Sequence, residues 1–300
     1  MIQTYKGVLT KNRINFKEDE PLSLHSTFRI GGNAKVFVMP STEEQLSMAV
    51  MLAITSGIRY YVIGKGSNIV FPDEGFDGAV ISTLGLNKTT VNGCTITAGA
   101  GTSFTELAVT ASKSCLTGLE FAYGIPGSLG GAVFMNAGAY DGEISFVVSR
   151  SRYFDTDKII FGEFVGDEHC FGYRESIYKK RTELIITNAE LSLSVGQKED
   201  IDAKMNDFIT RRREKQPLEY PSAGSAFKRY PGRYTAQMID EAGLKGFSIG
   251  GAQVSEKHAG FIINKGGATA ADVRNLSEYI KNRLFELHNI EIESEIIFVK

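Results

Sequence analysis

The glycine-rich stretch from Tyr123 to Tyr140 is the feature that most restricts how this chain can fold. Five glycines and one proline stand there among apolar residues. Glycine allows positive φ and lets a backbone approach a ligand closely, because it has no Cβ. Successive backbone N–H groups in such a loop, followed by a helix N-terminus, form a concave site for an anion such as a pyrophosphate. A tight buried turn between two packed elements explains the stretch equally well.

A second glycine loop, Gly64-Lys65-Gly66-Ser67-Asn68, strengthens the ligand interpretation. It follows an apolar run over 60–63 and leads into another strand-like run over 69–71. The dinucleotide fingerprint G-x-G-x-x-G instead opens a helix, so this loop does not match it. Two loops of this kind favour a dinucleotide whose pyrophosphate is held by backbone amides. Lys65 and Asn68 are not needed for that, and solvated loop positions explain them as well.

Composition excludes several broad classes of protein. The chain has 300 residues, 42% of them hydrophobic, which is enough for two or three domains with cores of their own. A net charge of -2 argues against broad nucleic-acid or membrane-surface binding, which needs a strongly basic face. The N-terminus lacks the apolar core of a signal peptide, and no apolar run is long enough to cross a bilayer.

The three cysteines, Cys94, Cys115 and Cys170, are odd in number and far apart. They form no C-x-x-C pair, so the sequence suggests neither a disulfide framework nor a zinc site. We therefore expect a soluble, cytoplasmic protein without a bound metal.

Hydrophobic periodicity predicts a mixed α+β fold. Residues 1–23 read as a mixed segment, and ordered structure is expected to begin near Leu22. Ser41 and Glu44 form a capping-box pattern for a helix that Gly57 ends. The remaining N-terminal pattern predicts a helix over 103–115 and short strands over 35–39, 60–63, 78–83, 89–91, 94–98, 146–154, 158–161 and 183–195.

The last hundred residues predict a smaller α+β domain. A helix within 199–215 has a basic C-terminal end that suits the helix dipole, and Pro217 and Pro221 then break the chain. We place the domain boundary between residues 195 and 196, with a first domain over 24–195 in two subdomains split near residue 70. Further elements are expected in the second domain, 196–300: helices over 234–242 and after a Thr269/Asp272 cap, and strands over 258–264 and 290–299.

Arg174 lies in an unusual non-helical setting, Phe171-Gly172-Tyr173-Arg174-Glu175-Ser176. Its planar guanidinium suits a carboxylate or phosphate and stays charged at all relevant pH values. An arginine paired with a nearby acid on the surface is the alternative.

Ser225 and the terminal acids are the other candidates for chemistry. Ser225 follows a glycine at the edge of a predicted strand, but no G-x-S-x-G elbow surrounds it, so a serine hydrolase is a weak interpretation. Glu291, Glu293 and Glu295 alternate with isoleucines, which places them on one face of an extended segment. That face is either a solvent-exposed edge or the wall of a cleft.

Together these segments resemble the UDP-N-acetylenolpyruvoylglucosamine reductases, the flavoenzyme family that completes UDP-N-acetylmuramic acid for peptidoglycan. The resemblance runs from about Leu24 to the C-terminus. Seven motifs carry it, in order and at matching spacing: Arg29-Ile30-Gly31-Gly32, Gly64-Lys65-Gly66-Ser67-Asn68, Gly124-Ile125-Pro126-Gly127, Asn136-Ala137-Gly138-Ala139-Tyr140, Phe171-Gly172-Tyr173-Arg174, Ala223-Gly224-Ser225-Ala226-Phe227-Lys228 and Glu293-Ser294-Glu295.

The resemblance implies FAD, bound noncovalently in a two-subdomain module of the vanillyl-alcohol-oxidase (PCMH) type, followed by a smaller α+β substrate domain. NADPH would reduce the flavin, and the reduced flavin would give hydride to C3 of the enolpyruvyl ether of UDP-N-acetylglucosamine-enolpyruvate. The positions implied to hold the cofactor are Gly64, Lys65, Gly66, Ser67, Asn68, Gly124, Ile125, Pro126, Gly127, Gly130 and Gly138.

The same resemblance implies three catalytic residues. Ser225 would protonate C2, while Arg174 and Glu295 would stabilise the enolate-like intermediate. Hydride addition at C3 drives negative charge into the substrate carboxylate, and a fixed arginine cation stabilises that charge as it develops. Glu295 can help only when it is protonated or donates a shared hydrogen, so we predict that it is buried with a raised pKa.

The residues implied to contact substrate are Tyr173, Lys215, Lys228, Arg229 and His258. Arg229 stands where many relatives have asparagine, and His258 where some have glutamine. No segment matches the tyrosine-bearing loop that one branch of the family folds over its substrate, so the chain resembles the shorter, type II branch. His25 is a weak candidate for covalent flavin attachment. We expect a monomer that binds neither nucleic acid nor membrane.

Two other functions stay open on the sequence. Another flavoprotein of the same fold, such as an oxidase of a small alcohol, would be reoxidised by oxygen rather than by the sugar nucleotide. A nucleotide-binding regulatory module would bind its ligand without turnover, and Ser225→Ala would then change nothing measurable.

Overall fold

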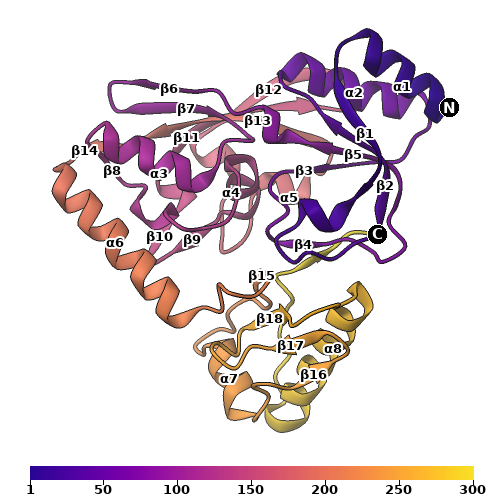
Figure 1. Cartoon of the computed structure of the whole chain (residues 1–300). Helices are drawn as coiled ribbons and strands as arrows, with labels where there is room; N and C mark the ends of the chain where they lie inside the picture. The colour runs from indigo at the N-terminus through magenta and orange to yellow at the C-terminus, as the bar shows by residue number, and fades with distance from the viewer. The chain divides into compact units, whose positions relative to one another are not determined.

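A computed structural model describes residues 1–300, and the chain forms two compact units. Unit 1 comprises Met1–Asp19, Lys35–Lys65 and Asp77–Thr210; unit 2 comprises Glu20–Ala34, Gly66–Phe76 and Arg211–Lys300 (Figure 1). Unit 2 thus combines the C-terminal residues with two short segments from the N-terminal part of the chain, whereas the sequence suggested contiguous domains over 24–195 and 196–300. Most of the helix Lys198–Lys215 belongs to unit 1 rather than to the C-terminal unit, because Ile201 and Met205 are buried in the core of unit 1.

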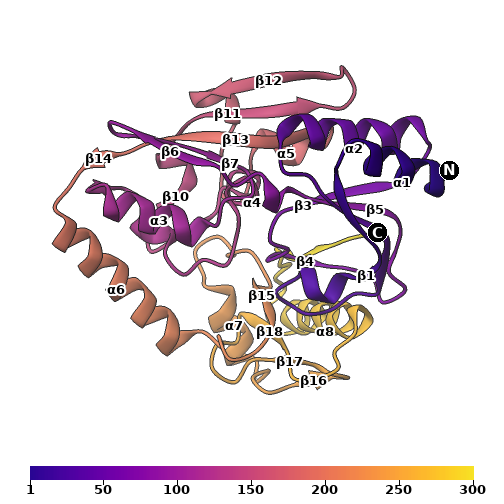
Figure 2. The same cartoon turned by 45° about the horizontal axis from the view of Figure 1, so that its top comes forward.

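The main sheet of unit 1 has five antiparallel strands in the order β12-β11-β13-β7-β6. Their bounds are β6 (Thr89–Asn92), β7 (Thr95–Gly99), β11 (Val148–Asp155), β12 (Ile160–Val165) and β13 (Leu184–Ser192). Two helices, α3 (Phe104–Lys113) and α4 (Leu129–Met135), lie on one side of this sheet (Figure 2). Their apolar faces and the inner face of the sheet form one core.

A second sheet has the order β1-β2-β5-β3 and is covered by two helices. The elements are α1 (Ile2–Lys11), β1 (Asn15–Pro21), β2 (Asn33–Met39), α2 (Glu43–Thr55), β3 (Tyr60–Ile63) and β5 (Phe76–Ser82). The expectation that order begins near Leu22 is wrong. Tyr5 and Leu9 on α1 are fully buried, and the Tyr5 hydroxyl donates to the Ala49 carbonyl at 3.1 Å.

Helix α2 begins one residue later than the sequence indicated. Thr42 is its N-cap and accepts from the Gln45 amide, whereas Ser41 contacts the Gln45 side chain. A hydroxyl at either position can supply the same kind of cap, so spacing alone did not decide between them. Gly57 follows the helix with φ +61, as expected for a residue just beyond a C-terminus.

Shorter elements complete unit 1. These are β8 (Leu116–Thr117), β9 (Gly138–Ala139), β10 (Gly142–Glu143), α5 (Ile177–Lys180) and β14 (Ser194–Val195), with most of α6 (Lys198–Lys215). The 3₁₀ helices of the chain are η1 (Leu22–His25), η2 (Thr83–Gly85), η3 (Glu120–Ala122), η4 (Ile144–Phe146) and η5 (Gly166–His169).

Unit 2 is built on a four-stranded sheet with the order β15-β18-β17-β16. Its elements are β15 (Ser222–Ser225), α7 (Thr235–Glu241), β16 (Ser248–Ile249), β17 (Ala252–Val254), β18 (Phe261–Asn264) and α8 (Ala270–His288). Thr269 and Asp272 form the predicted capping box of α8. The buried face of this helix packs on β16 and β17 through Val273, Leu276, Ile280 and Leu284.

The expected strand over 290–299 is shorter in the structure. Only β19 (Ile297–Phe298) is a strand, and it pairs in parallel with β4 (Ile69–Val70). The alternation is still visible in burial, because Ile290, Ile292 and Ile296 are buried while Glu291 and Glu293 are exposed. No helix of the chain combines the length and the apolar character that crossing a membrane requires.

Candidate active site

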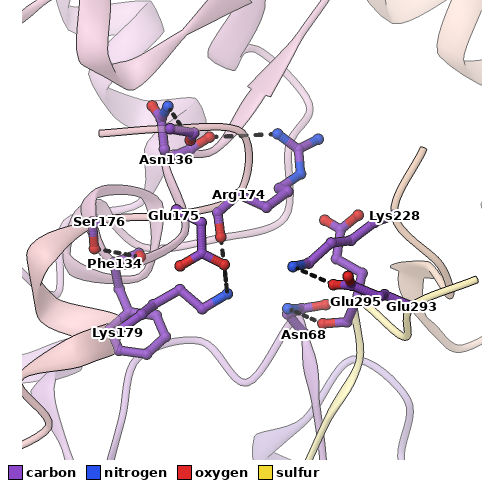
Figure 3. Close-up of polar contacts among 11 residues, drawn as sticks. Asn68, Phe134, Asn136, Arg174, Glu175, Ser176, Lys179, Lys228, Glu293 and Glu295 are labelled. Atoms are coloured by element: carbon purple, nitrogen blue, oxygen red, sulfur yellow. Dashed lines mark hydrogen bonds and ion pairs between the residues drawn. The ribbon is translucent and has the colours of Figure 1, made fainter. Parts of the chain in front are cut away.

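Arg174 lies in the non-helical segment that precedes α5, as expected, with a left-handed backbone of φ +56. Its guanidinium points toward Asn136 (Figure 3) and donates to the carbonyl oxygens of Asn136 at 3.4 Å and Gly138 at 3.2 Å. The guanidinium carbon also lies 5.2 Å from the centre of the Tyr173 ring. The side chain is half-buried, and Lys179 Nζ donates to the Arg174 carbonyl at 2.9 Å.

Asn136 organises the segments around this arginine. It is fully buried, ends α4 in a left-handed conformation, and donates to the Gly172 carbonyl at 2.9 Å and to Glu143 at 3.2 Å. Its side-chain oxygen accepts the Ser145 amide at 3.1 Å. One side chain therefore connects the turn after α4 to the segment that carries Arg174. The sequence motif contained Asn136, but this role was missed because Gly172 lies 36 residues further along the chain.

The long glycine stretch uses most of its amides internally. The amides of Ile125, Gly127, Leu129 and Gly130 donate to carbonyls of this chain, and the Gly124 amide donates to the Thr105 hydroxyl at 3.2 Å. Pro126 has no amide hydrogen and is exposed. The expected row of amides aimed at an anion is therefore not present over 124–130. The glycines there serve close packing: a Cβ on Gly130 would lie 2.9 Å from that of Ala100, and one on Gly138 would lie 2.5 Å from the Gly142 carbonyl.

The second glycine loop meets the long stretch at Ser128. A Cβ on Gly64 would lie 2.1 Å from the Ser128 hydroxyl, so any larger residue there would have to displace that hydroxyl. Ser128 is buried, and its hydroxyl has no hydrogen-bond partner within the chain. Because a buried hydroxyl without a partner is costly, this atom is suited to receive a ligand group. Sequence reasoning included Gly64 but passed over Ser128.

The last three residues of the second loop, 66–68, belong to unit 2. Gly66 has φ +65, its carbonyl accepts the Thr27 amide at 3.1 Å, and a Cβ there would lie 2.1 Å from the His25 carbonyl. Lys65 is exposed and Ser67 is half-buried. His25 itself contacts Glu20 at 2.8 Å.

Unit 2 brings the chain segments of Ser225 and Glu295 together. Ser225 ends β15 and is exposed, as expected for a residue at the edge of a strand. The Glu295 amide donates to the Ala226 carbonyl at 2.9 Å, and its carbonyl accepts the Asn68 side chain at 2.9 Å. A residue beside Ser225 therefore anchors Glu295 although they are distant in sequence. Glu295 is half-buried rather than buried as expected, and its raised pKa stays a prediction.

The predicted substrate contacts of unit 2 lie around these segments. Lys228 forms a 2.8 Å ion pair with Glu293, a partner that the sequence analysis did not assign (Figure 3). The Arg229 guanidinium lies 5.3 Å from the centre of the Tyr234 ring. Lys215 is exposed at the end of α6.

His258 lies in the turn before β18 rather than within a strand. Its Nδ1 accepts the Gly260 amide at 3.1 Å, and the Gly260 carbonyl accepts the Ala226 amide at 2.8 Å. Desolvation by burial lowers the pKa of His258. The imidazole is therefore neutral near pH 7, with its hydrogen on Nε2, and one glycine links it to the Ser225 strand.

Of the three predicted catalytic residues, Arg174 belongs to unit 1, whereas Ser225 and Glu295 belong to unit 2. In unit 1, backbone carbonyls hold the Arg174 guanidinium. In unit 2, the segment that carries Glu295 is hydrogen-bonded to the residue after Ser225. No group of three or more histidine, cysteine or acidic side chains is arranged to hold a metal ion.

Comparisons with known proteins cover nearly the whole chain and indicate the same family. Residues 34–156 match the FAD binding domain family, and residues 216–299 match the C-terminal domain of UDP-N-acetylenolpyruvoylglucosamine reductase. Reductases of that name from Clostridium botulinum (strain Hall) and Clostridium perfringens (strain SM101) are each 44% identical, over 98% and 95% of this chain and 95% and 93% of their own lengths.

A solved structure agrees as well. The crystal structure of the reductase from Thermus caldophilus superposes with a TM-score of 0.80 at 32% identity, covering 96% of this chain and 99% of that one. The expected α+β fold with an FAD-binding module is confirmed. Because the sequence identity to the curated relatives is 44% over nearly their full length, the chain belongs to the UDP-N-acetylenolpyruvoylglucosamine reductase family.

Proposed function

We propose that this chain reduces the enolpyruvyl ether of UDP-N-acetylglucosamine-enolpyruvate to UDP-N-acetylmuramate, with NADPH as the hydride donor. The observation that carries the proposal is the pairing of the Ser225 and Glu295 segments through the Glu295 amide and the Ala226 carbonyl. It holds the segment that carries a hydroxyl donor next to the segment that carries an acid, and a reaction that adds a proton beside a developing negative charge requires both kinds of group.

The residues present fit noncovalent FAD. The buried Ser128 hydroxyl has no protein partner, and the missing side chain of Gly64 beside it leaves the backbone and this hydroxyl close together as polar contacts for a ligand. Gly64, Gly66 and Ser67 would hold the cofactor with Ser128, while the self-bonded stretch over 124–130 would form a rigid wall. Bound FAD supplies a carrier that takes hydride from NADPH and delivers it to C3 of the enolpyruvyl ether.

Three side chains would act on the substrate. The Arg174 guanidinium would hold the substrate carboxylate and stabilise the negative charge that enters it. Ser225 would donate its hydroxyl proton to C2, and Glu295 would donate a hydrogen bond to the enolate-like oxygen. The net change adds one hydride at C3 and one proton at C2 and oxidises NADPH to NADP⁺.

The substrate's sugar-nucleotide portion would contact Tyr173, Lys215, Lys228, Arg229 and His258. Lys228 would reach it from its ion pair with Glu293. We place the chain in the type II branch, because it carries no tyrosine-bearing loop of the longer kind. The monomeric state, the cytoplasmic location and the domain boundaries 24–195 and 196–300 stay predictions.

Spectroscopy of the purified protein tests this function. The protein is expected to be yellow, to lose its flavin absorbance on mixing with NADPH, and to regain it on adding UDP-N-acetylglucosamine-enolpyruvate faster than with oxygen alone. Colourless protein that cannot be reconstituted with FAD would contradict the proposal. Preferential reoxidation by oxygen would favour an oxidase instead.

A further inference from the structure

A buried hydroxyl on β11 joins two residues that flank Arg174 in the sequence. Ser151 Oγ lies 2.7 Å from His169 Nε2 and 2.6 Å from the Tyr178 hydroxyl. All three side chains are fully buried in unit 1. His169 ends η5 before Arg174, and Tyr178 lies in α5 after it. The segment that carries the arginine is therefore attached at both ends to a single serine. We call Ser151, His169 and Tyr178 the clasp.

The hydrogen bonds of the clasp run from Tyr178 as donor, through Ser151, to His169 as acceptor. His169 Nδ1 lies 2.8 Å from the Gly166 carbonyl, which can only accept, so Nδ1 carries the hydrogen. In the neutral imidazole, Nε2 then accepts from the Ser151 hydroxyl, and Ser151 accepts from Tyr178. Burial lowers the pKa of His169 and raises that of Tyr178, and both directions keep these side chains neutral. Every member is satisfied, as a rigid buried polar network requires.

Other contacts join the clasp to the arginine. The His169 ring stacks on Phe171 with centroids 5.0 Å apart and planes 2° from parallel. The Ser176 hydroxyl donates to the Phe134 carbonyl at 2.7 Å, on the helix that Asn136 ends. Between these anchors the backbone takes its left-handed turn at Arg174, a conformation that a non-glycine residue keeps only where its surroundings enforce it.

We propose that Ser151, His169 and Tyr178 are positioning residues that hold Arg174 in place for charge stabilisation. This inference rests on the proposed role of Arg174. None of the three touches the substrate; they act by fixing the two ends of the arginine segment. Preorganised groups lose effect quickly when they are displaced, so release of one end lowers the rate of the step that Arg174 stabilises.

Ser151→Ala is the decisive variant, and Ser112→Ala is its matched control. Ser112 is also buried in unit 1, and its hydroxyl also donates to a side chain, that of Asp202, but this bond joins α3 to α6. Stopped-flow measurements follow flavin reduction by NADPH and flavin reoxidation by UDP-N-acetylglucosamine-enolpyruvate separately. Hydrogen exchange of residues 170–177 reports on the segment itself, without turnover.

Ser151→Ala is expected to slow reoxidation by the sugar nucleotide at least about tenfold and leave reduction by NADPH within about twofold. Amides of residues 170–177 should exchange faster, while Ser112→Ala should leave both half-reactions and this exchange unchanged. Tyr178→Phe keeps the ring and leaves the Ser151–His169 hydrogen bond in place, so it should produce the same selective loss to a smaller degree. It also replaces Ser151→Ala as the test if that variant fails to fold.

Unchanged reoxidation in a folded Ser151→Ala protein, or equal slowing of both half-reactions, would overturn the positioning role. Arg174→Ala separates this outcome from failure of the proposed function. If Arg174→Ala leaves reoxidation unchanged, the role of the arginine is wrong, whereas the exchange of residues 170–177 still decides whether the clasp holds the segment.

Discussion

The catalytic contribution that we propose for Glu295 depends on the protonation state of its side chain. Its backbone is fixed on both sides, by Ala226 and by Asn68, so its position follows the strand beside Ser225. As a bare carboxylate it would repel the negative charge that the reaction creates. As a protonated acid it can donate to that charge. The half-buried setting of its side chain leaves room for a substrate to complete its desolvation.

Two substitutions at Glu295 separate these states. Glu295→Gln keeps a hydrogen-bond donor of similar shape, so it should retain more of the reoxidation rate with the sugar nucleotide than Glu295→Ala. The comparison is made by stopped-flow absorbance at saturating substrate. Equal losses in the two variants would count against a protonated acid.

Ser225 offers a second test at this scale. Removing a general acid typically costs about 10²–10⁴-fold in rate, so Ser225→Ala should slow reoxidation by the sugar nucleotide by that order and spare reduction by NADPH. Ser222→Ala, on the same strand β15, is the control and should change neither rate. A Ser225→Ala protein that turns over like its parent would favour the regulatory-module alternative.

At the scale of elements, helix α1 is the one that differs most from the expectation drawn from the sequence. Its apolar residues are few and its overall pattern is mixed, yet Tyr5 and Leu9, four residues apart, place one stripe against α2. Short amphipathic helices gain their stability from tertiary packing more than from propensity. A segment that reads as a mixed tail in the sequence therefore forms part of the core of unit 1.

Leu9→Ala measures what this packing contributes. A fully buried leucine truncated to alanine typically costs about 2–5 kcal/mol, so the free energy of unfolding should fall by that order. Urea denaturation followed by circular dichroism gives the value. Gln3→Ala on the exposed face of the same helix should stay within about 0.5 kcal/mol of the parent. Equal effects would mean that α1 is not packed as described.

At the scale of the whole molecule, buried neutral histidines make stability depend on pH. Burial lowers the pKa of His169 and of His258, whereas an unfolded histidine titrates near about 6.5. Just below that pH these two histidines are protonated in the unfolded chain but stay largely neutral in the folded chain. The free energy of unfolding should therefore fall as pH drops from 7 through the unfolded pKa.

His169→Gln tests this dependence. The variant removes one of the two histidines, so its free energy of unfolding should be lower at pH 7 but should change less between about pH 7 and pH 5.5 than that of the parent. Urea denaturation at several pH values gives, for each protein, the slope of the free energy of unfolding against pH. Parallel slopes for the two proteins would contradict a neutral buried His169.

The sequence by itself determined the family and those local elements whose signals lie within a short stretch of chain. The Thr269/Asp272 cap and the apolar stripe of α8 are contained within one helix, and the glycine, arginine and serine motifs are contiguous, so neighbouring residues suffice to specify them. The tertiary structure decided which distant groups meet. The hydroxyl of Ser128 beside Gly64, the role of Asn136, and the attachment of Glu295 to Ala226 depend on long-range pairing. Residue spacing does not encode such pairing, because the burial and hydrogen-bond partner of a polar group are set only when separate segments pack together.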